Sequence, residues 1–148
     1  MGVKIFILTK WGNTMKRILL LSFTLLISST VAATTEHYIL REGNHVQHLK
    51  ITKVGEEINV SMDVDFEPTG SAEEGRNSCS AQISGEAKAV SENEIVLKKQ
   101  AEGEARYCTL TLKISNDGVN VEQSPDCNYF VAGICHFESD GRELVKVK

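Results

Sequence analysis

Apolar and polar residues alternate along several stretches of the chain. In residues 57–66, every second position from Ile58 to Phe66 is apolar, and the positions between are polar or acidic. A period of two is the pattern of a strand with one buried face and one face in water. Residues 106–115 repeat it, so the sequence predicts strands over both stretches. The apolar positions of the second stretch are Cys108, Leu110, Leu112 and Ile114.

Turn signals separate further strands. Asn116-Asp117-Gly118 predicts a tight hairpin, because Asp-Gly supplies the positive φ that such a turn needs, and the return strand is 118–123. Glycines between the remaining apolar runs, Gly85 among them, are interpreted as turns. Residues 87–91 fit a helical turn and a strand continuation equally well. Weaker strands are predicted over 38–41, 45–54, 78–84, 94–99, 134–137 and 143–147.

About eight short strands with frequent turns, and no long helical pattern, indicate an all-β domain. We expect a small antiparallel barrel or sandwich. Three loops interrupt the regular pattern, at 67–77, 100–104 and 124–133. Binding residues commonly lie on loops that a rigid scaffold holds in place, so these loops are the first places to look for a site.

The first part of the chain has the organisation of an export signal. Basic residues at Lys16 and Arg17 precede an apolar run over 18–27, and small residues follow up to Ala33. The run is too short for a membrane span, and no second apolar stretch follows. We therefore expect a signal peptide over 1–33, with either a true start at Met15 or a long n-region from Met1, and a single β domain over 34–148. That domain would be periplasmic or secreted, with no membrane span after cleavage.

All four cysteines lie after the predicted signal, where an oxidising compartment favours pairing into two disulfides. Cys79 and Cys108 each share a strand face with apolar neighbours, so we predict that they pair inside the sheet. Cys127 and Cys135 would then close the loop around Tyr129. Four cysteines allow three pairings, and spacing alone leaves the choice open. No CxxC pair is present, so we expect no zinc site.

Charge narrows the choice of partner. Residues 1–33 hold four of the sixteen basic residues and none of the acidic ones, which leaves 12 basic and 20 acidic residues, a formal charge of −8, in the domain. An acidic surface is unsuited to nucleic acid, whose phosphates need a basic face. It is suited to a basic protein partner, because complementary fields speed the encounter.

No motif for catalysis, metal or cofactor binding is present. The chain lacks GxSxG, HExxH and a glycine-rich phosphate loop, so we predict no catalytic residues and no cofactor. His45 and His48 fall on opposite strand faces, and no partner is evident for His136. The acidic row that begins at Asp63 is interpreted as a solvated strand face, because Pro68 stands where a calcium loop needs glycine.

The segment 101–107 carries a resemblance to a known family. Gly103, Arg106 and Tyr107 are similar to the end of the Ser-Gly-x-x-Arg-Tyr loop of the periplasmic inhibitors of c-type lysozyme. Members of that family are small exported eight-stranded barrels whose loop enters the lysozyme cleft. Glu102 and Glu104 depart from the pattern, since small or hydroxyl residues are expected there. The resemblance implies that Glu104 and Arg106 would face the enzyme.

A second candidate segment lies between the last two cysteines. Tyr129 and Phe130 would be either an interface anchor, since aromatic residues dominate binding hot spots, or a plug for the barrel end.

The leading hypothesis is thus an exported binding protein, not an enzyme, that inhibits a cell-wall-degrading enzyme such as lysozyme or confers immunity to one. The alternative is a small-ligand carrier, although bulky inward residues such as Met62 and Leu112 favour a filled barrel. An enzyme without a recognisable signature is the third hypothesis.

Overall fold

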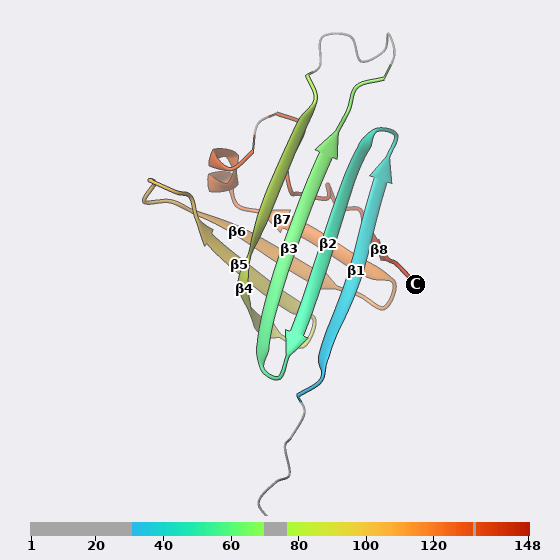
Figure 1. The fold of residues 1–148 in the computed structure, drawn as a ribbon, viewed down its shortest axis with the longest axis vertical. Coiled ribbons are helices and arrows are strands. Elements are labelled where there is room, and N and C mark those ends of the chain that lie inside the picture. Colours follow the sequence, from blue (N-terminus) through green and yellow to red (C-terminus); the bar gives the residue numbers. More distant parts are fainter. Residues whose placement is uncertain (1–30, 70–76, 132) are drawn as a thin grey trace, which may run out of the picture. The chain divides into compact units, whose positions relative to one another are not determined.

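Eight strands form a closed antiparallel barrel in the computed structural model, which describes residues 31–69, 77–131 and 133–148 (Figure 1). Each strand pairs with its neighbours in chain order, and β8 closes the barrel by pairing with β1. The predicted signal segment falls almost entirely outside the described residues. The elements are β1 (Ala33–Glu42), β2 (His45–Val54), β3 (Glu57–Phe66), β4 (Cys79–Ser91), β5 (Glu94–Gln100), β6 (Tyr107–Ile114), β7 (Gly118–Gln123), the 3-10 helix η2 (Pro125–Tyr129) and β8 (Leu144–Lys146).

The strands that the alternation predicted most clearly are confirmed. β2, β3 and β7 have the predicted bounds, and β6 differs by one residue at each end. Along β3, Val60, Met62 and Val64 are buried while Asp65 is exposed, as a strand with one wet face requires. The all-β expectation is therefore confirmed, and of the two architectures considered it is the barrel that forms. Within the described ranges, no helix has the length and apolar character to cross a membrane.

The turn predicted at Gly85 is wrong, because this glycine lies inside β4. The strand pairs with β3 from Cys79 to Ala87 and with β5 from Ala87 to Ser91, so it passes from one side of the barrel to the other. In Figure 1, β1 to β3 run side by side and β5 to β7 cross behind them. A Cβ at Gly85 would stand 3.3 Å from Cδ1 of Leu97 on β5. The missing side chain marks a close approach of two elements rather than a turn.

The strand predicted over 134–137 is also wrong. This segment runs across one end of the barrel, where side chains rather than a neighbouring strand satisfy its backbone. The Phe137 N–H donates to Oε1 of Gln123 at 2.8 Å, and Nε2 of Gln47 donates to the carbonyl of His136 at 3.2 Å. Phe137 itself is fully buried. Its apolar side chain explains the strand-like pattern, but the segment closes the barrel instead of extending it.

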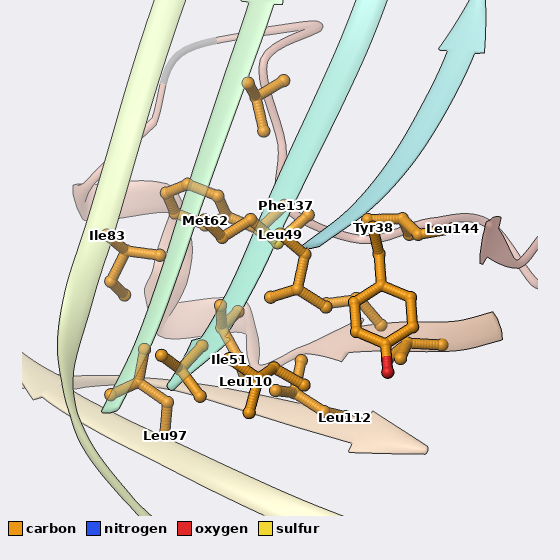
Figure 2. Packing of buried hydrophobic residues seen from close by; sticks show 14 of the residues in the cluster. Tyr38, Leu49, Ile51, Met62, Ile83, Leu97, Leu110, Leu112, Phe137 and Leu144 are labelled. Atoms are coloured by element: carbon orange, nitrogen blue, oxygen red, sulfur yellow. The ribbon is translucent and has the colours of Figure 1, made fainter. Parts of the chain in front are cut away.

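Large apolar side chains fill the barrel. Leu49 and Met62 on one side meet Leu110 and Leu112 on the other, and Phe137 joins them from the segment that crosses the end (Figure 2). All five are at most 1% exposed. The packed interior favours a barrel that serves as a scaffold over one that carries a ligand inside.

Two disulfides are present, but their pairing differs from the prediction. Cys79 is joined to Cys135 and Cys108 to Cys127. Cys79 begins the half of β4 that pairs with β3, whereas the strand of Cys108, β6, pairs with β5 and β7. Cys79 and Cys108 therefore lie on strands that are not neighbours, and side chains that face the same core need not be close enough to form a disulfide. The residue that lies next to Cys108 is in η2, the helix packed on β6.

Candidate functional site

Two segments that the sequence singled out separately meet on one exposed surface. The guanidinium carbon of Arg106 lies 4.5 Å from the ring centre of Tyr129, and an Arg106 N–H donates to the Tyr129 hydroxyl. Arg106 comes from the β5–β6 loop, and Tyr129 ends η2, 23 residues later. We call this area, formed by residues 102–107 together with Tyr129, the loop surface. It combines a cation and an aromatic ring, the residue types enriched at protein interfaces.

Backbone hydrogen bonds fix the loop that presents Arg106. The Glu104 N–H donates to the carbonyl of Ala101 at 3.1 Å, and the Ala101 N–H donates to the carbonyl of Arg106 at 3.3 Å. Nε2 of Gln100 also donates to the Glu104 carbonyl at 2.8 Å. Gly103 has φ of +76°, a conformation that suits glycine and lets the chain reverse here. The loop is therefore a defined turn rather than an open connection.

A covalent bond and two hydrogen bonds fix the helix that presents Tyr129. The Cys108–Cys127 disulfide ties η2 to β6 with 4.2 Å between the Cα atoms. The Ser124 N–H donates to the carbonyl of Thr109, and the Thr109 N–H donates to Oγ of Ser124. Because the same strand, β6, follows the loop and anchors the helix, Arg106 and Tyr129 keep their relative position.

Tyr107 supplies a second aromatic ring. It is 44% exposed, and Nζ of Lys98 lies 5.4 Å from its ring centre. Tyr129 is 51% exposed. Each ring thus lies against a cation on one side, while much of its surface is free to contact a partner.

The two glutamates of the loop are exposed. Among the described residues, the ion pairs of the structure involve neither Glu102 nor Glu104. Their carboxylates are therefore exposed on the loop and form no salt bridge within the described part of the chain. The loop surface accordingly presents negative charge together with the cation and the rings.

Tyr129 and Phe130 have different roles, although the sequence left one choice open for both. Phe130 is partly buried and packs against the core cluster, whereas Tyr129 points into solvent. Phe130 therefore belongs to the edge of the core, and the exposed position that an anchor needs belongs to Tyr129.

His45 and His136 form a pair that the sequence did not predict. The rings of His45 and His136 are stacked with 6.0 Å between centroids and 22° between planes, and Nε2 of His136 lies 3.2 Å from Oδ2 of Asp140. His136 therefore has two partners, His45 and Asp140, although none was evident from the sequence. One signal was available, because His45 and Gln47 are polar at positions that share a face with buried Leu49.

The structure gives no metal centre among the residues it describes, since no three His, Cys, Asp or Glu side chains are grouped to hold an ion. A shallow polar depression of about 480 Å³ lies between η2 and the following segment, next to Asn128, His136 and Glu138. A second depression, of about 520 Å³, lies over outward-facing residues of β1 to β3, such as His48 and Asp63. Both lie on the outside of the packed core.

The chain matches no protein-family model, and no curated protein or solved structure is significantly similar to it.

Proposed function

We propose that the domain is an exported binding protein that inhibits a cell-wall-degrading enzyme, with c-type lysozyme as the first candidate, or that confers immunity to such an enzyme. The observation that carries the proposal is the exposed pairing of Arg106 with Tyr129 on the loop surface. Gly103, Arg106 and Tyr107, which carry the resemblance to the lysozyme inhibitors, lie on the same surface.

Rigidity supports this role. A loop that is already ordered loses little conformational entropy when it binds, so more of its contact energy appears as affinity. The β5–β6 turn is hydrogen-bonded, and η2 is tied to β6 by the Cys108–Cys127 disulfide. Tyr and Arg are also the residues that most often carry binding energy at protein interfaces.

Charge supports a basic partner. Residues 34–148 have a formal charge of −8, and Glu102 and Glu104 extend from the loop surface. Such a field speeds association with a basic enzyme and penalises acidic proteins. The two disulfides are compatible with an oxidising compartment, which agrees with the proposed location in the periplasm or outside the cell.

The test is inhibition of peptidoglycan lysis by a panel of c-type and other lysozymes, with complex formation followed by gel filtration. We expect Arg106→Ala to weaken inhibition by about 30-fold, the effect of losing a residue worth about 2 kcal/mol. Arg41→Ala is the matched control, because Arg41 is an exposed arginine on β1, and it should leave inhibition within about twofold. Failure of the unaltered protein to inhibit or bind any enzyme of the panel would end the proposal.

A further inference from the structure

The inward face of β2 becomes polar where the barrel ends. Leu49 and Ile51 on this face are buried in the core, and Gln47 is also buried, at 1% exposure. His45, two residues earlier, continues the same face. Polar groups in such positions need partners from whatever covers the barrel end.

The partners come from residues 134–140, which we call the cap segment. Nε2 of Gln47 donates to the carbonyls of His136, at 3.2 Å, and Glu138, at 2.9 Å. The ring of His136 is stacked on that of His45. Two consecutive inward side chains of β2 therefore hold the cap segment, one through its amide and the other through its ring.

A hydrogen-bonded turn fixes His136 on its other side. Its Nδ1 lies 3.2 Å from the Ile134 carbonyl, and its Nε2 lies 3.2 Å from Oδ2 of Asp140. Asp140 has φ of +52° and Gly141 has φ of +76°, so the chain reverses at this point and returns the carboxylate to the ring. The cap segment thus presents His136 to His45 in one defined orientation.

The environment of His45 suits a neutral ring. Its Nε2 is buried and has no hydrogen-bond partner among the described residues. Facing it are Phe66 on β3, which is apolar, and Glu42 on β1, whose carboxylate is already paired with Arg142. Burial, together with the proximity of His136, lowers the pKa of His45, and a hydrogen bond with the Ile134 backbone and the charge of Asp140 oppose this only in part.

We propose that His45 and His136 form an acid-sensitive latch that holds the cap segment on the barrel end while His45 is neutral and loosens it when His45 is protonated. Protonation would place a buried N–H without an acceptor next to the His136 ring, and both the lost solvation and the charge repulsion oppose that state. The Cys79–Cys135 disulfide would keep the N-terminal part of the cap segment tethered. The proposal does not depend on the proposed inhibitory function.

Amide hydrogen exchange of the full protein measures the latch directly. The Phe137 N–H donates to Gln123 and the Ser139 N–H donates to the carbonyl of Val121, so both amides are protected only while the cap segment is docked. After correction for intrinsic exchange, we expect their protection to fall by about tenfold or more between about pH 7.5 and about pH 5, with no comparable fall at Met62 in β3.

Three variants separate the latch from general acid sensitivity. His45→Gln removes the titrating ring, and the pH response of the Phe137 and Ser139 amides should disappear. His48→Gln, on the exposed face of the same strand, is the control and should retain the response. If His45→Gln does not fold, His136→Gln removes the neighbouring ring and should reduce the response, because only the burial of His45 then opposes its protonation. Equal protection of the cap segment at both pH values, or a full response in either ring variant, would overturn the proposal.

Discussion

The disulfide pairing predicts which tryptic peptides of the unreduced protein stay joined. Trypsin cleaves between Cys79 and Cys108 and again after Lys113, but no Lys or Arg lies between Cys127 and Cys135. The observed pairs therefore join three tryptic peptides, 77–88, 107–113 and 114–142, into one species. The pairing predicted from strand direction would instead give a two-peptide species and a separate peptide 114–142 closed on itself.

The magnitude follows from the sequence separations. Cys79 and Cys135 are 56 residues apart, so in the chain-entropy model their bond stabilises the fold by about 4 kcal/mol. Cys108 and Cys127 are 19 residues apart, which gives about 3 kcal/mol. Both values are large fractions of the total stability of a domain, which is about 5–15 kcal/mol.

The assay is urea unfolding at neutral pH of two double variants, Cys79→Ala/Cys135→Ala and Cys108→Ala/Cys127→Ala. Each should lose stability by about its loop value, with a larger slope because the unfolded chain is less constrained. Each variant should keep the other bond, seen as one linked pair of tryptic peptides. Recovery of peptide 107–113 in disulfide linkage to 77–88 alone would refute the pairing and with it the placement of η2 on β6.

Two further predictions concern the closure of the barrel between β1, β7 and β8. Burial, together with donation of its hydroxyl to Glu36, raises the pKa of Tyr38 to about 12. Because this pKa lies above that of tyrosine in the unfolded chain, the neutral Tyr38 side chain contributes fully to stability below about pH 10. That contribution is lost as the pH rises through about 12. Near-ultraviolet titration should show this late phenolate step, and Tyr38→Phe should remove it. Gly118→Ala should lower the free energy of unfolding by about 2 kcal/mol or more, because the new Cβ would stand 2.3 Å from the backbone oxygen of Leu144. Gly85→Ala, whose new Cβ would meet only side-chain atoms of Leu97 and Lys99, should cost less in the same urea experiment, and the reverse order would contradict this account.

Local patterns of apolar and polar residues predicted several strands correctly. The alternation in β2, β3 and β7 is a property of consecutive residues, so the bounds of these strands could be predicted without knowledge of the partner strands. The predictions were wrong where the conformation of a segment depends on residues far away in the sequence. Gly85 resembles a turn until its approach to Leu97 is known, and residues 134–137 resemble a strand until Gln47 and Gln123 are seen to bind their backbone.

For the candidate site, too, the sequence indicated individual residues but not the contacts between them. Arg106 and Tyr129 could each be selected from loop position and residue type, but their contact depends on η2 lying against β6, which alternation does not encode. Along the sequence, the histidine nearest to His45 is His48, which lies on the opposite face of β2. The partner of His45, His136, lies 91 residues away in sequence and reaches it only because the cap segment crosses the barrel end.

The two disulfides act on different parts of the molecule, which makes the two proposals separable. Cys108–Cys127 holds the helix that places Tyr129 against Arg106, whereas Cys79–Cys135 holds the cap segment that places His136 against His45. A covalent bond that restrains one end of a segment leaves the other end dependent on weaker contacts. For η2, those contacts are the paired hydrogen bonds between Ser124 and Thr109, which carry no titratable group. For the cap segment they include a histidine, and for this reason we expect acid to loosen the cap segment while the loop surface stays in place.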